Sequence, residues 1–221
     1  MNTIREVIQN QRVIFDGGSG TILQKKGLRG GELPGTWNLA HPEEILSLYK
    51  GYLEAGAMVF NTNTFGADRF HYGTELEEII RSGVRLAHQA RTEAHREDSF
   101  IALDIGPCGK LLQPYGDLAF EEAVEVFAEI VRFGMMEQPD LILIETMSDS
   151  YEAKAALLAA KENSDLPVFV TCTFDEKGKL LTGGTVQSLV PMLEGLGADA
   201  VGLNCSLGPR EMIPLVKEFM E

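Results

Sequence analysis

The amino-acid sequence predicts an α/β fold, specifically a (β/α)8 barrel of the TIM type in which about six βα units are present. Three observations lead to this prediction. Short apolar runs alternate with longer amphipathic segments six times in succession. The apolar runs are continuous, which is typical of parallel strands buried beneath helices. Polar residues stand at the C-terminal end of nearly every run, as at the mouth of a barrel, whereas an open sheet would gather only those near its switch point.

Each element follows from this pattern in chain order. The expected strands are the apolar runs at 13–18, 58–65, 100–107, 141–147, 167–174 and 200–206. The expected helices are the amphipathic stretches at 42–55, 75–95, 120–138, 150–163, 185–196 and 209–220. The Gly-rich segment from Gly17 to His41 is expected to be a long loop, which in a compact domain is usually functional or disordered.

The length of the chain bears on how much of the barrel it holds. Complete barrels need about 250 residues. We therefore expect residues 1–221 to form one barrel domain that is incomplete at its C-terminal end by two βα units. The two outer strands would then lack neighbours, and unprotected strand edges favour association or poor solubility.

Composition excludes several classes of partner. The chain carries 19 basic and 33 acidic residues, a net charge of -14, which opposes binding to nucleic acid or to an anionic membrane. The three cysteines are an odd number without a close pair, so a disulfide framework is not expected. There is no signal-peptide pattern and no apolar run of membrane-spanning length. We expect a cytoplasmic protein.

The motif DGGSGT follows the first expected strand. Its glycines allow a close approach of the backbone, so the amides around Gly17, Gly18 and Ser19 could hold an anion such as a substrate carboxylate, and Asp16 ends the strand in a group that could do chemistry. For a lone Gly-rich loop, a simple tight turn is the favoured interpretation. The spacing fits neither the dinucleotide fingerprint nor the phosphate loop, which argues against nucleotide binding.

Three further polar groups end strands. Glu145 directly follows LILI, and because an unpaired buried carboxylate is costly, a site role is favoured over a structural ion pair. Asp104 stands in the same relation to its strand, but the GPCG that follows could make it a turn residue. In NTNTFGA, alternation sends only half of the polar residues into the mouth. Asn63 is a candidate there, although turn formation or helix capping is an equal alternative.

Asn204 and Cys205 end the last expected strand. A cysteine alone is more often a small apolar residue than a metal ligand, and Cys108, Cys172 and the four histidines have no ligand-like spacing. A Schiff-base aldolase on the same barrel would need a lysine at a strand end. That reading is weak, because the lysines lie in expected loops and helices. A phosphate-binding barrel remains untested, because its anion site follows strands seven and eight.

Taken together and in order, DGGSGT, ELPGTWNLAHPE, NTNTFGA, LILIETM and GLNCS resemble the homocysteine S-methyltransferase family along essentially the whole chain. The pairing of WNLAHPE with EAGAMVFNTNTFGA is closest to its cobalamin-dependent methionine synthase branch. The resemblance implies a (β/α)8 barrel with a zinc ion held by three cysteines. Cys205 matches the first of these, and the family's adjacent pair in a Gly-Gly-Cys-Cys-Gly segment has no counterpart here.

The resemblance also implies an activity. The expected enzyme is a methyltransferase in which zinc activates the thiolate of homocysteine for attack on a methyl donor, expected to be methylcobalamin on another module, with cobalamin and folate modules as partners. No catalytic residue beyond the metal site is implied. Strand-end placement and the resemblance together lead to the hypothesis that Glu145, and with it Asp16, faces the substrate ammonium. With Cys205 alone the fragment is expected to be inactive and to hold little zinc. The alternatives are a betaine- or S-methylmethionine-type homocysteine methyltransferase and a non-catalytic barrel fragment.

Overall fold

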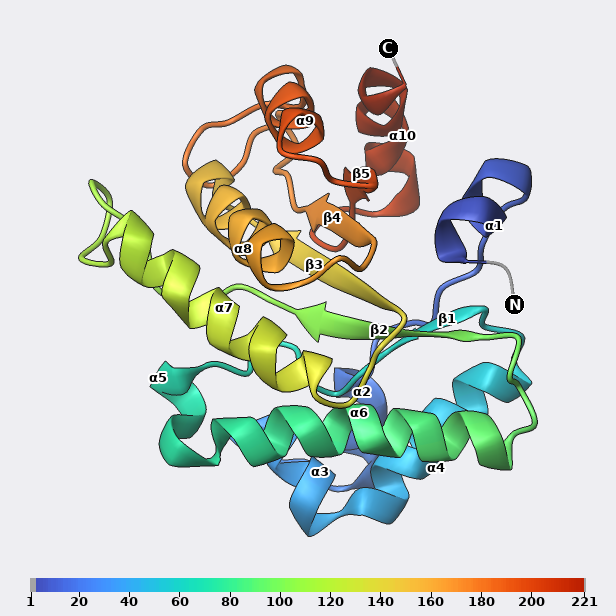
Figure 1. Ribbon diagram of the computed structural model, residues 1–221. Coiled ribbons are helices and arrows are strands. Elements are labelled where there is room, and N and C mark those ends of the chain that lie inside the picture. Colours follow the sequence, from blue (N-terminus) through green and yellow to red (C-terminus); the bar gives the residue numbers. More distant parts are fainter. Residues whose placement is uncertain (1–2, 221) are drawn as a thin grey trace.

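The computed structural model describes residues 3–220, which contain one parallel sheet with helices packed around it. Its strands lie side by side in chain order: β1 (Val59–Asn61), β2 (Phe100–Ile105), β3 (Leu141–Met147), β4 (Val168–Cys172) and β5 (Ala200–Leu203). All neighbouring strands are parallel and are connected through helices (Figure 1). Sequential parallel strands with crossover helices form the wall of a partial (β/α)8 barrel, as the sequence predicts.

The helices are α1 (Ile4–Asn10), α2 (Gly20–Lys26), α3 (Trp37–Ala40), α4 (Pro42–Glu54), α5 (Arg69–Tyr72), α6 (Leu76–Glu93), α7 (Phe120–Met135), α8 (Ser150–Asn163), α9 (Val186–Gly195) and α10 (Pro209–Phe219), with 3-10 turns at Pro34–Thr36 and Gly73–Glu75. Each of the six predicted amphipathic segments forms a helix whose ends agree to within a few residues (α4 and α6 to α10), and four short helices, α1, α2, α3 and α5, were not predicted. The segment from Gly17 to His41 therefore contains α2 and α3, where an irregular loop was expected. None of the helices within residues 3–220 has both the length and the apolar character needed to cross a membrane.

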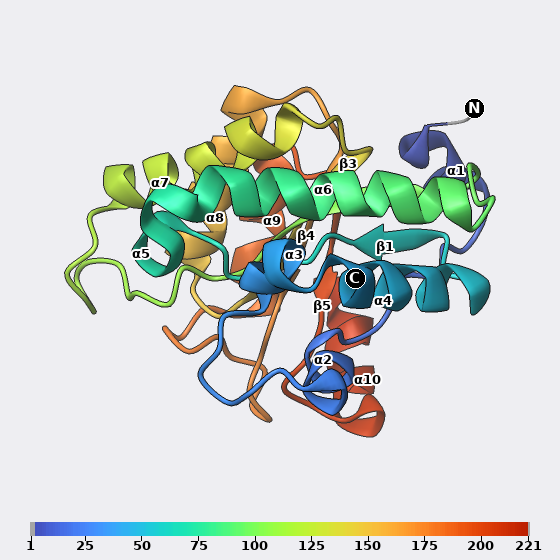
Figure 2. The same ribbon diagram turned by 90° about the horizontal axis from the view of Figure 1, so that it is seen from below.

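The two faces of the sheet have different covers. On the outer face, Ile142, Ile144, Val168 and Val170 pack against helices in the largest apolar cluster. Figure 1 shows α6, α7 and α8 along this face, and Figure 2 shows α4 beside α6. On the inner face, side chains two residues apart on each strand form a separate cluster that includes Ile4 of α1: Val59, Phe100, Ala102, Leu141, Leu143 and Phe169. The inner cluster is thus the apolar interior of the barrel.

The first predicted strand is reduced to a single β-bridge. Residues 13–18 run parallel to β1, but only Phe15 forms a bridge, to Val59. The reason lies in the next residue. The Asp16 carboxylate accepts a hydrogen bond from the backbone amide of Asn61 at 2.8 Å. In a longer first strand, a backbone carbonyl would accept the hydrogen bond from this amide instead. The glycines that follow then turn the chain away from the sheet.

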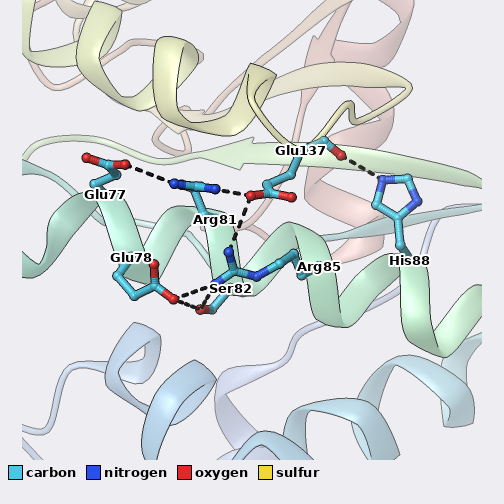
Figure 3. Close-up of polar contacts among 7 residues, drawn as sticks. All are labelled: Glu77, Glu78, Arg81, Ser82, Arg85, His88 and Glu137. Atoms are coloured by element: carbon cyan, nitrogen blue, oxygen red, sulfur yellow. Dashed lines mark hydrogen bonds and ion pairs between the residues drawn. The ribbon is translucent and has the colours of Figure 1, made fainter.

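Charged residues on α6 are tied to the segment between α7 and β3. Arg81 contacts Glu77 at 3.0 Å and Glu137 at 2.8 Å, and Arg85 contacts the same Glu137 oxygen at 3.3 Å. His88 Nε2 lies 2.9 Å from the Glu137 carbonyl oxygen (Figure 3). These contacts join two consecutive βα units on the outside of the barrel.

A second set of ion pairs lies where the strands begin. Asp140 contacts Arg91 at 2.7 Å, and Asp199 contacts Arg5 of α1 at 2.6 Å. Each carboxylate also accepts a hydrogen bond from a backbone amide at the start of a neighbouring strand, at 2.7 Å for Asp140 and 2.9 Å for Asp199. We call these four residues the N-terminal rim. Each buried or half-buried carboxylate here therefore has both a cation and an amide as partners.

A carboxylate-lined cleft at the C-terminal ends of the strands

A cleft of about 480 Å³ opens at the C-terminal ends of the strands. Every residue that the sequence singled out as a site candidate lines it: Asp16, Gly17, Gly18, Ser19, Asn63, Glu145, Asn204 and Cys205. They come from four separate segments, which meet because the C-terminal ends of parallel strands converge. The volume suits a small molecule such as an amino acid.

The floor of this cleft is a row of polar residues above the apolar interior. Asn61, Asp104, Glu145 and Thr171 each stand two residues beyond an inward-facing apolar residue, so alternation places them on the same inner face. Among residues 3–220, three buried side-chain oxygens in this row have no hydrogen-bond partner: Asn61 Oδ1, Asp104 Oδ1 and Thr171 Oγ1. Native proteins leave few such atoms, and they commonly mark the place of a ligand or water.

The end of β3 is held to the end of β5 by Asn204. Its Nδ2 donates to Glu145 Oε2 at 2.9 Å and to Thr146 Oγ1 at 2.7 Å, and its Oδ1 accepts the Thr146 amide at 3.0 Å. The register between β3 and β4 shifts at this point, and Thr146 has a φ of 61°. Cys205 has a φ of 57°. Left-handed backbone is unfavourable for a β-branched residue and clusters at functional sites.

Three carboxyl groups share this cleft. Burial raises the pKa of Asp16 to about 7, with the nearby Glu145 adding to the rise. Burial also raises the pKa of Asp104, which is 4 % exposed, well above its usual range, and Glu145 and Asp16 raise it further. The pKa of Glu145 is likewise raised by burial. Among the described residues, no lysine, arginine or histidine lines the cleft, so the carboxyl groups have no cation to pair with.

The glycine segment faces these carboxyl groups from one side. Tyr52 Oη donates a hydrogen bond to the Gly18 carbonyl oxygen at 3.0 Å. A Cβ added at Gly17 would lie 3.0 Å from Tyr52 Oη. A side chain at position 17 would therefore crowd the Tyr52 ring, which glycine avoids. Within residues 3–220 the amides of Gly17, Gly18 and Ser19 donate to no protein acceptor. They are available to an anionic group of a ligand.

Asn63 lines the cleft but is occupied by structural contacts. Its Nδ2 donates to the Pro34 carbonyl and to Asn38 Oδ1, both at 2.9 Å, while its amide donates to Tyr49 Oη. Thr62 and Thr64 bond each other at 2.7 Å. The NTNT segment therefore fixes the loop before α4 against the mouth, so the turn-forming alternative describes Asn63 at least as well as ligand binding.

Some lining residues were not among the sequence candidates. Tyr49 and Tyr52 come from α4, and Asn61 and Thr146 come from β1 and from the shifted end of β3. The tyrosines gave no signal, because an aromatic residue on an amphipathic helix is typical of a core. Asp104 did give a signal, because it stands at a strand end like Glu145. The GPCG segment that follows is typical of a turn, so the inward position of Asp104 was not predicted.

A second cavity adjoins the first. It has a volume of about 630 Å³ and runs along the inner face between residues 8–16 and β5. It shares four residues with the cleft: Asp16, Asn61, Glu145 and Asn204. Its other walls are largely apolar, from Phe15, Leu143 and Phe169 among others. The carboxyl groups thus border a polar and an apolar space at once.

Metal-ligating side chains are sparse at the mouth. The exposed Cys205 thiol lies 3.9 Å from Thr146 Oγ1 and 3.5 Å from Asn204 Nδ2. Cys108 and Cys172 are buried elsewhere. In the described part of the chain, no group of three or more His, Cys, Asp or Glu side chains has the arrangement of a metal site. Cys205 can supply one ligand, but residues 3–220 do not build a zinc site.

Comparison with known proteins supports both the fold and the family. The sequence profile of the homocysteine S-methyltransferase family matches residues 13–221. Methionine synthase from Mycobacterium tuberculosis is 28% identical over 226 residues, covering 94% of this chain and 19% of that protein, and methionine synthase from Mycobacterium leprae gives the same values. The chain therefore spans about a fifth of the length of these relatives.

Solved structures give the same fold. The metallated form of the homocysteine methyltransferase MmuM from Escherichia coli superposes with a TM-score of 0.84 at 19% identity, covering 99% of this chain and 82% of that one. Its apo form superposes with a TM-score of 0.77 at 20% identity, covering 99% and 80%. The predicted partial barrel is thereby confirmed.

Proposed function

The chain belongs to the homocysteine S-methyltransferase family, and from this premise we propose that its cleft binds homocysteine and presents the thiol for methylation. Homocysteine has three chemical groups to recognise: an ammonium, a carboxylate and a thiol. The cleft offers a different environment for each. The proposal assigns the substrate-binding role to Asp16, Gly17, Gly18, Ser19, Glu145 and Asn204, with Asn63 behind them as support for the loop.

The observation that carries the proposal is the group of carboxyl side chains without a cation. An ammonium group placed among Asp16, Asp104 and Glu145 would supply the missing positive charge and the missing hydrogen-bond donors. The free backbone amides of residues 17–19 would then donate hydrogen bonds to the substrate carboxylate. With both ends of the amino acid held, the side chain of the substrate is directed toward Cys205 at the edge of the cleft.

The thiol needs activation before it can attack a methyl group. A free thiol with a pKa near 8.5 is only a few per cent thiolate at pH 7. Zinc held by three thiolates would stabilise the substrate thiolate at its open fourth position. We propose Cys205 as one such ligand, and since residues 3–220 do not complete the site, the remaining ligands must come from elsewhere and the isolated chain should be inactive.

We further propose methylcobalamin, carried on another module, as the methyl donor, with cobalamin and folate modules as partners. The support is the similarity to proteins named methionine synthase, of which this chain spans about a fifth. Betaine and S-methylmethionine are the alternative donors. Assays with each donor, on a chain extended through a complete set of zinc ligands, distinguish them, and an extended chain that binds homocysteine but accepts no methyl group from any donor would favour a non-catalytic module.

A reducing compartment suits these residues. Cys108, Cys172 and Cys205 are all unpaired thiols, and a thiol ligand must stay reduced to bind zinc. We therefore propose a cytoplasmic location, which redox-state labelling of the cysteines in cells would test.

The decisive experiment measures binding of L-homocysteine under reducing conditions by calorimetry. Glu145→Gln keeps the shape of the side chain and removes its charge, so the dissociation constant should rise by about 10- to 100-fold, the value of one charged hydrogen bond. Glu122→Gln on the exposed surface of α7 is the matched control and should change nothing. An unchanged affinity in Glu145→Gln would remove Glu145 from the site.

A further inference from the structure

Two carboxyl groups come from neighbouring strands into the same cleft. Asp104 on β2 and Glu145 on β3 belong to the same inner face of the sheet, and both line the cleft. Among the described residues no cation lines the cleft to neutralise them, and two ionised carboxylates cannot hydrogen-bond to each other, because both are acceptors only. We therefore expect one of the two to hold a proton while the cleft is empty.

The surroundings favour Asp104 as the residue that carries it. Asp104 is the more deeply buried of the pair, and its Oδ1 has no partner within residues 3–220. Glu145, in contrast, already accepts from Asn204 at 2.9 Å, a bond that stabilises the ionised form. The other titratable groups facing Asp104 are Asp16 and Tyr49 of α4, and neither supplies positive charge. Burial raises the pKa of both Asp104 and Glu145, in agreement with a retained proton.

We propose that Asp104 and Glu145 share one proton in the ligand-free cleft and that the ammonium group of the substrate displaces it, so that amino-acid binding releases a proton to solvent. The inference rests on the proposed function and adds Asp104 to the recognition of the substrate. The balance of the step is simple. The O–H bond of the Asp104 carboxyl group breaks, its proton leaves to water, and the substrate ammonium keeps all three of its own protons.

A consequence distinguishes this arrangement from an ordinary ion-pair site. Below the pH at which the pair ionises, affinity for the amino acid should rise about tenfold for each pH unit, because one proton must leave for each molecule bound. Above that pH the affinity should be flat. A site whose carboxylates are already ionised at neutral pH would show no such slope there.

The test uses L-methionine, because it lacks a thiol and its binding cannot release a thiol proton. Calorimetric titrations in phosphate and Tris at the same pH give the number of protons released from the difference in apparent enthalpy. We expect about one proton per bound methionine for the unmodified chain at pH 8.5, where Asp16, whose pKa is raised to about 7, is already ionised. Asp104→Asn keeps a hydrogen-bond donor in place of the carboxyl group but has no proton to lose, so it should bind about tenfold more weakly and release close to none.

Two controls sharpen the result. Asp98→Asn alters an exposed carboxylate at the opposite end of β2 and should leave the proton count unchanged. The desamino analogue 4-(methylthio)butanoate lacks the ammonium group and should release no proton. Methionine binding that is independent of the buffer, or a proton count that survives Asp104→Asn, would overturn the proposal.

A measurement without ligand separates this proposal from the proposed function. Infrared spectra of the empty chain at pH 8.5, where Asp16 is already ionised, should contain the C=O stretch of a protonated carboxyl group, which disappears in Asp104→Asn and persists in Asp98→Asn. Absence of that band overturns the shared proton, whatever the chain binds. A band that is present while neither methionine nor homocysteine binds overturns the proposed function and the displacement by ammonium, but leaves the shared proton supported.

Discussion

The two ends of the barrel treat their carboxylates in opposite ways. At the N-terminal rim, Asp140 and Asp199 each have an arginine and a backbone amide as partners. At the mouth, Asp104 and Glu145 are as deeply placed or deeper, yet among the described residues they have no cation. Acidic side chains are thus paired with cations at one end of the sheet and lack a cation at the other.

The difference separates stability from binding. A paired carboxylate that also accepts a backbone amide fastens strands and helices together and has no capacity left for a ligand. An unpaired carboxylate in a cleft costs folding free energy and is retained where it binds something. Substitutions at the rim should therefore lower stability, whereas substitutions at the mouth should lower affinity and leave stability equal or higher.

The largest effect is expected at the rim. Arg91→Ala leaves Asp140 half-buried without its cation and removes the bond from Arg91 to the Ser99 carbonyl. The free energy of unfolding should fall by about 2 kcal/mol, measured by urea denaturation at pH 7. Lys50→Ala removes an exposed ion pair with Glu93 on the helical surface and should cause no measurable change. Equal effects of the two substitutions would contradict the distinction between the rim and an ordinary surface pair.

A change of opposite sign is expected at the mouth. In the folded protein, burial disfavours the charged form of the Asp104 carboxyl group. Asp104→Asn removes this group, so at pH 8 the free energy of unfolding should rise by about 1 kcal/mol. Thermal unfolding of the ligand-free protein checks this directly. A marked loss of stability would show that Asp104 holds the fold together, as the rim residues do.

The dependence of stability on pH should also divide the two ends. The folded pKa of Asp16 is raised to about 7, so between pH 4 and 7 the folded chain binds more protons than the unfolded chain. The contribution of Asp16 to stability therefore falls as pH rises through this window and is constant above it. Asp199 has a lowered pKa, so its contribution is lost only as pH falls below the normal range of a carboxyl group.

Urea denaturation between pH 4 and 8 measures both slopes. Asp16→Asn should flatten the decline between pH 4 and 7, because the amide oxygen can still accept the Asn61 amide but cannot titrate. Asp199→Asn should leave that decline in place. If Asp16→Asn and the unmodified chain give parallel curves, the raised pKa of Asp16 does not govern stability in this range.

The smallest effect concerns backbone strain. Gln138, near the rim, has a φ of 55°, and Thr146, at the mouth, has a φ of 61°. Gln138→Gly should stabilise the fold by about 0.5–1 kcal/mol, because glycine adopts this conformation without strain. Thr146→Gly should relieve strain too, but it removes the Oγ1 that binds Asn204, so homocysteine affinity should drop several-fold. Calorimetry and urea denaturation on both variants would show whether only the strain at the mouth serves binding.

How much the sequence could predict differs along the chain. The strand-end candidates from Asp16 to Cys205 lie in one cleft because continuous apolar runs identify parallel strands, and parallel strands bring their ends together. The single bridge at Phe15 could not be predicted, since it depends on the Asp16 side chain replacing a backbone partner. The placement of Asp104 and Glu145 on one face of neighbouring strands depends on register, which a single sequence does not reveal.

The distribution of the cysteines gives the chain a built-in reporter. Burial raises the pKa of both Cys108 and Cys172 to about 12, while the thiol of Cys205 is exposed at the mouth. In the folded state an alkylating reagent should therefore label Cys205 alone, without any engineered residue. The rate of Cys205 alkylation then measures the occupancy of the cleft, because it should fall in proportion to the fraction of clefts that hold an amino acid.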